Sequence, residues 1–166
     1  LTNESNTATD VVMTLSDGSA NAGADYDATS VVVTYADNST ETVAVNGDGT
    51  FTVSVPANDT TFSITVQTAQ DTTFEGDETF TLSGYTASQG EANAAVGTAT
   101  ITDDGTTPPP GGGTPDDDRL NVLSISSMDV SEGSPAQFDV VLTNESNTAT
   151  DVVMTLSDGS ANAGAD

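Results

Sequence analysis

The chain has 166 residues, of which 26 are Asp or Glu and 1 is Lys or Arg, so its formal net charge at pH 7 is −25. A surface this acidic repels nucleic acid and anionic membranes, which argues against partners of either kind. The chain contains no Cys and no His, which argues against thiol chemistry and against a domain held by disulfides.

The sequence of the first 25 residues is repeated at the other end of the chain. Leu1–Asp25 reads LTNESNTATDVVMTLSDGSANAGAD, and the same 25 residues recur at Leu142–Asp166, 141 residues further on. Identity over this length indicates a tandem array with that period. We therefore predict that residues 1–104 are the later part of one repeat, lacking its first strands, and that residues 119–166 are the first part of the next.

Apolar residues alternate with polar ones along much of the chain, as in half-buried strands. Turn-forming sequences such as SDGSANAG, ADNS, NGDG and VPANDT separate the alternating runs, and we read NGDG at Asn46–Gly49 as a hairpin turn rather than a calcium loop. The pattern predicts an all-β, immunoglobulin-like β-sandwich. The alternating residues are, in chain order, Val11, Met13 and Leu15; Val31, Val33 and Tyr35; Phe51, Val53 and Val55; Phe62, Ile64 and Val66; Phe80 and Leu82; Ala99 and Ile101; Leu123 and Ile125; and Phe138, Val140 and Leu142.

The segment from Gly105 to Asp118 reads GTTPPPGGGTPDDD and has no apolar residue that could join a core. Its composition predicts a linker over residues 105–118. The three aspartates at its end, Asp116, Asp117 and Asp118, favour a solvated charge run, with an interdomain cation site as the alternative.

Catalysis is poorly supported by the composition. Paired carboxylates can hydrolyse glycosides, but the chain has no His, Cys or Lys for other acid-base or nucleophilic work, no Trp, and 3 Tyr to stack on a sugar. We therefore predict that the protein is not an enzyme.

Four short motifs carry a family resemblance. They are SEGS at Ser131–Ser134, AGADYD at Ala22–Asp27, DTTFEGDETF at Asp71–Phe80 and TITDD at Thr100–Asp104. In this cyclic order they resemble the Calx-beta and related immunoglobulin-like repeats of giant bacterial surface adhesins of the RTX type.

The resemblance implies that Ca²⁺ is bound by acidic loops at one pole of the sandwich. At the matching positions, the implied ligands are Asp25, Asp71, Glu75, Asp103, Asp104 and Glu132, and Asp166, the repeat equivalent of Asp25, is expected to serve the next unit. The chemistry agrees, because two carboxylates 4 Å apart repel by about 4 kcal/mol at an effective dielectric near 20 and Ca²⁺ takes six to eight oxygen ligands. Any single acid could instead be a solvated turn residue bonded to its own backbone.

These inferences lead to a functional hypothesis. We expect an extender repeat of an adhesin on the bacterial surface, exported by type I secretion and rigidified by calcium so that it projects a distal binding domain. Neighbouring identical repeats are the expected partners. Residues 120–166 could complement residues 26–104 of another chain, head to tail, or those of the same chain if the linker reaches back. The alternatives are a glycan-binding or ice-binding module of such an adhesin, or a calcium-sensing Calx-beta domain.

Overall fold

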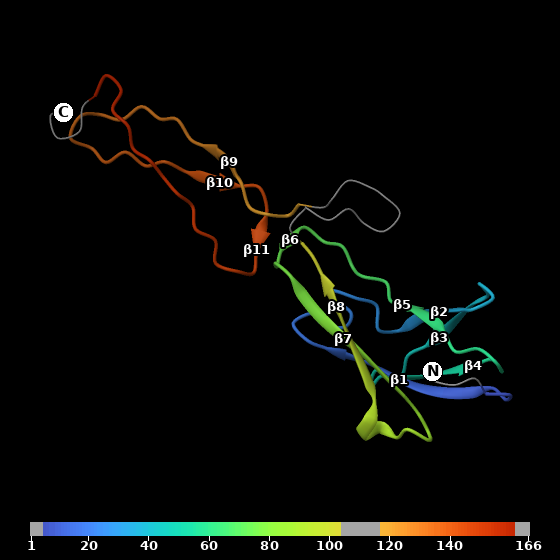
Figure 1. The fold of residues 1–166 in the computed structure, drawn as a ribbon. Coiled ribbons are helices and arrows are strands. Elements are labelled where there is room, and N and C mark those ends of the chain that lie inside the picture. The colour runs from blue at the N-terminus through green and yellow to red at the C-terminus, as the bar shows by residue number, and fades with distance from the viewer. Residues whose placement is uncertain (1–4, 104–116, 162–166) are drawn as a thin grey trace. The chain divides into compact units, whose positions relative to one another are not determined.

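The computed structural model of the chain describes residues 5–103 and 117–161 (Figure 1). Most of the predicted linker, together with the predicted ligands Asp104 and Asp166, therefore lies outside the described residues. The chain divides into two compact units, of which the first comprises Leu1–Asp71 with Asp77–Thr102, and the second Thr72–Gly76 with Asp103–Asp166.

The first unit contains a four-stranded antiparallel sheet and a three-stranded antiparallel sheet. The four-stranded sheet has the order β4-β1-β7-β8, and its strands are β4 (Thr50–Val55), β1 (Thr9–Asp17), β7 (Glu78–Thr86) and β8 (Ala95–Ile101). The three-stranded sheet has the order β3-β2-β5, and its strands are β3 (Thr40–Ala44), β2 (Ser30–Tyr35) and β5 (Phe62–Thr65). A 3-10 turn, Glu91–Asn93, lies between β7 and β8.

Both sheets contribute to one hydrophobic core, so the first unit is a β-sandwich, as predicted. In β1, β2 and β4 alternate side chains are buried, because successive residues of a strand point to opposite faces of the sheet. The buried residues are Val11, Met13 and Leu15 of β1; Val31 and Val33 of β2; Phe51, Val53 and Val55 of β4; Phe80 of β7; and Ala20 and Tyr26 of the β1–β2 loop.

The predicted turn at NGDG is confirmed, but it is not the predicted hairpin, because β3 and β4, which it joins, belong to different sheets. The backbone N–H of Gly49 donates to the carbonyl of Asn46 at 2.9 Å, and Gly49 has a φ of +82°. A Cβ at Gly49 would collide with the carbonyl oxygen of Leu15, so the position requires glycine both for its backbone conformation and for its space. The sequence reading missed β3, which precedes this turn, because TETVA lacks a regular apolar alternation.

The β1–β2 loop is fastened to the core by Tyr26, which is 2% exposed. Its ring stacks on Phe80 with the ring centroids 4.3 Å apart, and its hydroxyl donates to Oδ1 of Asp17 at 2.6 Å. The backbone N–H of Ala22 donates to the same Asp17 oxygen at 2.9 Å. These contacts fix the AGADYD loop at one end of the sandwich.

The buried Tyr26 predicts a loss of stability at alkaline pH. Burial, followed by the hydrogen bond and the negative charge of Asp17, raises the pKa of the Tyr26 hydroxyl to about 12, whereas an unfolded tyrosine titrates near pH 10. Between about pH 10 and 12 the unfolded chain loses this proton while the folded chain keeps it. The free energy of unfolding should therefore fall with rising pH, by up to about 3 kcal/mol.

Denaturant melts of three proteins across this pH range test the expectation. Tyr26→Phe should remove this part of the pH dependence, and Tyr85→Phe should keep it. Equal slopes for all three proteins would show that Tyr26 does not hold its proton in the folded state.

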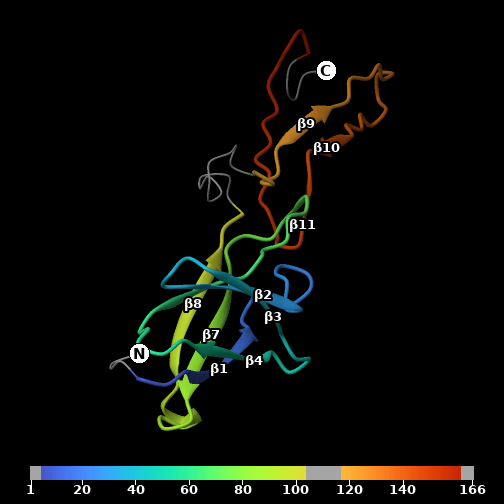
Figure 2. The same cartoon turned by 90° about the vertical axis from the view of Figure 1, so that its right-hand side faces the viewer.

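The second unit is described by two short strand pairs. β9 (Val122–Ile125) pairs antiparallel with β10 (Val140–Leu142), as Figure 2 shows, and β6 (Thr73–Phe74) pairs parallel with β11 (Glu145–Ser146). The predicted solvated run of aspartates holds for Asp117, which pairs with Arg119 at 2.7 Å, but not for Asp118, which is buried. The backbone carbonyl of Asp118 accepts from the side chain of Asn144 at 2.9 Å.

The two copies of the repeated sequence differ sharply in burial. In the first copy Val11, Met13 and Leu15 are 6%, 8% and 4% exposed, and β1 lies between β4 and β7. The equivalent residues of the second copy, Val152, Met154 and Leu156, are 39%, 54% and 94% exposed. Because the sequences are identical, the flanking strands decide whether this segment is buried.

Candidate metal centre

Asp25 is held in place at the end of the β1–β2 loop. The backbone N–H of Asn21 donates to Oδ2 of Asp25 at 2.6 Å, and the backbone N–H of Asp25 donates to the carbonyl of Asn21 at 3.0 Å. Its own carbonyl accepts from the backbone N–H of Ala69 at 2.8 Å. The partly buried carboxylate is thus oriented before any ion binds.

Glu78 is the first residue of β7 and pairs in register with Ile101 of β8. It stands two residues before the buried Phe80 and therefore on the core-facing side of the sheet. β7 begins at Glu78, at the end of the sandwich where the β1–β2 loop lies. The Glu78 side chain therefore extends toward the same end of the sandwich as this loop.

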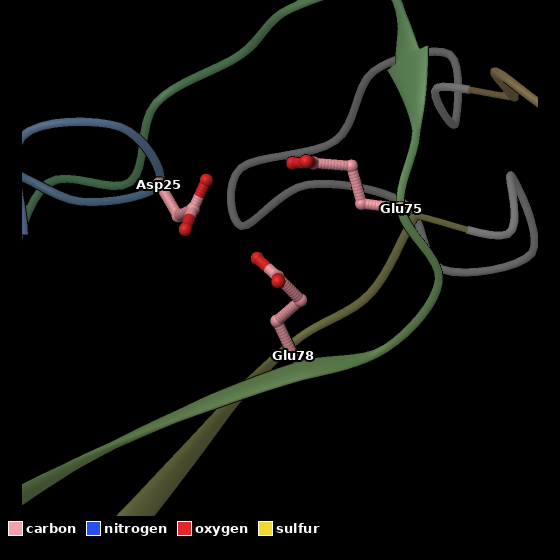
Figure 3. A group of neighbouring side chains, drawn as sticks. All are labelled: Asp25, Glu75 and Glu78. Carbon is pink, nitrogen blue, oxygen red and sulfur yellow. The ribbon is translucent and has the colours of Figure 1, made fainter. Parts of the chain in front are cut away.

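The carboxylate oxygens of Asp25 and Glu78 lie within 4.8 Å of each other. Figure 3 draws these two side chains together with Glu75, which precedes Glu78 by three residues. Two oxygens that each lie about 2.4 Å from one Ca²⁺ are at most about 4.8 Å apart, so the pair is spaced for a shared ion. The remaining coordination positions of such an ion would be filled by other oxygens, from water or carbonyl groups.

The structure also describes four other predicted ligands. Asp71 is exposed, and its backbone carbonyl accepts from the side chain of Gln70 at 2.7 Å. Within the second unit, Oδ2 of Asp103 accepts from the backbone N–H of Glu75 at 2.8 Å. Oε1 of Glu75 accepts from the side chain of Asn147 at 2.7 Å, and Glu132 is exposed. The roles of these four residues in metal binding stay predictions.

Glu78 is the residue that the sequence reading missed. In DTTFEGDETF it stands among several acids, and the motif alone does not separate Glu78 from Asp77. The available signal was the alternation: Phe80 and Leu82 mark the core-facing side, and counting back by two reaches Glu78.

Three acids of the first unit fit the simple turn interpretation instead. Asp27, Asp37 and Asp48 each accept hydrogen bonds from the hydroxyl and the backbone N–H of the residue two positions later. These bonds, above all those from the hydroxyl groups, lower the pKa of the three carboxyl groups. Such side chains close turns, and they carry no indication of a metal.

Comparison with known families identifies the domain type. The family model of the Calx-beta domain matches residues 1–47, 47–105 and 116–166, which together cover nearly the whole chain. Two of the matches meet at Gly47, inside the NGDG turn that joins β3 to β4. No curated protein and no solved structure gives a significant match. Among the described residues, no helix has the length and apolar character needed to cross a membrane.

Proposed function

The chain belongs to the Calx-beta family, a family of calcium-associated β-domains, and on that premise we propose that it is an extender segment of a long bacterial surface adhesin. The observation that carries this proposal is the exact return of 25 residues after a period of 141. A binding tip is needed once in a fibre, whereas a spacer is needed many times.

Calcium is the proposed ligand that folds and stiffens the repeat. Asp25 and Glu78 supply two carboxylates within 4.8 Å, and the net charge of −25 with a single basic residue leaves the chain without internal counter-charge. Unbalanced charge of this size opposes compaction. A divalent ion bound between two carboxylates converts local repulsion into attraction.

Calcium binding of this kind would let the repeat fold outside the cell but not inside it. Extracellular calcium modules bind with dissociation constants of about 10⁻⁴ to 10⁻³ M, far above cytosolic calcium. A chain of such domains would stay loosely folded during export and would fold outside the cell. At free calcium about one hundred times the dissociation constant, each site adds about 2.7 kcal/mol to the free energy of unfolding.

Small-angle X-ray scattering tests the extender role on the parent polypeptide, which carries the repeat in tandem. In calcium, the maximum dimension should grow in proportion to the number of repeats, and chelation of calcium should shorten the particle and broaden its size distribution. Magnesium at equal ionic strength is the control. Identical scattering in calcium, in magnesium and after chelation would contradict a calcium-stiffened extender.

A further inference from the structure

Asn46, which begins the turn between β3 and β4, is the only asparagine of the chain that precedes a glycine. Asparagine is a thermolabile residue. An asparagine loses its side-chain amide most readily before glycine, because glycine has no Cβ to hinder the approach of its own nitrogen to the neighbouring side chain. Whether the folded chain permits this loss depends on the surroundings of Asn46 and Gly47.

The nitrogen that would attack the side chain is accessible and unrestrained. Asn46 and Gly47 are both exposed, and in the part of the chain that the structure describes the backbone N–H of Gly47 has no hydrogen-bond partner. A Cβ built at Gly47 would meet no atom within 4 Å, so the backbone has room to rotate toward the Asn46 side chain. The two residues also line a surface cavity of about 350 Å³, which gives water access to the reacting atoms.

One hydrogen bond restrains the Asn46 amide. Its Nδ2 donates to Oγ1 of Thr50 at 3.0 Å, and the hydroxyl of Thr50 donates to Oδ1 of Asp48 at 2.6 Å. The bond holds the nitrogen that leaves and not the carbon that is attacked. At an exposed position it contributes little, because water competes for both groups.

We propose that Asn46 is a site of spontaneous deamidation in the folded protein, and that the isoaspartate product opens the β3–β4 turn. The Gly47 nitrogen gives its proton to solvent base, and its electron pair forms a bond to Cγ of Asn46. The bond from Cγ to Nδ2 breaks, and Nδ2 takes a proton from water and leaves as ammonia. Water then opens the cyclic imide, at Cγ to give aspartate or at the former backbone carbonyl to give isoaspartate. The net reaction consumes water, needs no metal or oxidant, and is independent of the proposed calcium function.

Isoaspartate adds a methylene group to the main chain of a turn that has no room for it. The carbonyl of Asn46 accepts from the backbone N–H of Gly49 at 2.9 Å, and the carbonyl of Gly49 accepts from the backbone N–H of Leu15 in β1 at 2.9 Å. In isoaspartate the first of these carbonyls leaves the main chain and becomes a free carboxylate. Gly49 cannot adjust, because it packs directly on the carbonyl of Leu15. The lengthened turn must therefore detach from β1.

Peptide mapping by mass spectrometry locates the reaction after the full, folded chain has been incubated at mildly alkaline pH. Asn46 should be the first asparagine to convert, with isoaspartate among its products. Asn38 and Asn58 are the internal controls, because they are also exposed but precede a serine and an aspartate. Gly47→Ala should slow the loss by roughly tenfold, because a Cβ restricts the backbone and hinders the attacking nitrogen.

Thermal melts test the effect on the turn. Anion-exchange chromatography separates the modified chains, which carry one more negative charge, and peptide mapping identifies the fraction with isoaspartate. Asn46→Asp is the matched control, because it has the same added charge but a main chain of normal length. The isoaspartate form should melt at a lower temperature than Asn46→Asp.

Four results would overturn the proposal. Conversion of Asn38 or Asn58 as fast as Asn46, or an equal rate in Gly47→Ala, would remove the site assignment. Loss of the Asn46 amide in denaturant alone would show that the fold protects the turn. Equal melting temperatures for the isoaspartate form and Asn46→Asp would show that the turn stays closed.

Discussion

Leu15→Ala should lower the free energy of unfolding by about 2–5 kcal/mol, whereas Leu156→Ala should leave it unchanged. Leu15 is 4% exposed in β1, between β4 and β7, so its truncation removes apolar contacts and leaves a cavity. Leu156 is the same residue of the repeated sequence but is 94% exposed. The two variants thus compare one substitution, in one local sequence, at two depths of burial.

Denaturant unfolding followed by circular dichroism measures both effects. Met13→Ala and Met154→Ala form a second pair with the same design, at 8% and 54% exposure. Equal losses within a pair would mean that both copies of the segment are buried in solution. A loss confined to the second copy would mean that it replaces the first in the sandwich.

Glu78→Gln should abolish most of the stabilisation that calcium gives the protein. The substitution keeps the size of the side chain but removes one of two carboxylates that lie within 4.8 Å of each other, and Ca²⁺ affinity depends strongly on the number of charged ligands. The matched control is Asp77→Asn, which removes one negative charge at the neighbouring exposed position. At free calcium about one hundred times the dissociation constant of the wild-type site, the difference in the free energy of unfolding between the two variants should approach about 2.7 kcal/mol.

Thermal melts of both variants, with and without calcium, measure this difference. Asp25→Asn should behave like Glu78→Gln, because Asp25 provides the other carboxylate of the pair. If Asp77→Asn lost as much calcium response as Glu78→Gln, calcium would be screening a diffuse negative charge, and the assignment of these ligands would fail.

The sandwich was predictable because most of its strands have one face in the core. Val11, Met13 and Leu15 show the pattern clearly, and the turn at Asn46–Gly49 marks where the chain reverses. β3 was not predictable in this way, because TETVA has little side-chain burial to impose an alternation.

The candidate site was predictable only in part. The AGADYD motif pointed to Asp25, whose position follows from local bonds to Asn21 and from the burial of Tyr26. Glu78 depends on the register between β7 and β8, which no local motif encodes. Similarly, Asp118 stands in a run of three aspartates that favours solvation, and its burial arises from packing within the chain.

A calcium titration of thermal stability tests the central claim most directly. The wild-type chain is melted over a range of free calcium, with magnesium at equal ionic strength as the control. The account predicts an upward shift of Tm that grows with the logarithm of free calcium above the dissociation constant. Magnesium should not reproduce it, because magnesium demands a smaller octahedral site and gives up its water reluctantly. Equal small shifts with both ions would show that the acids form a screened surface, and would contradict a calcium-folded extender.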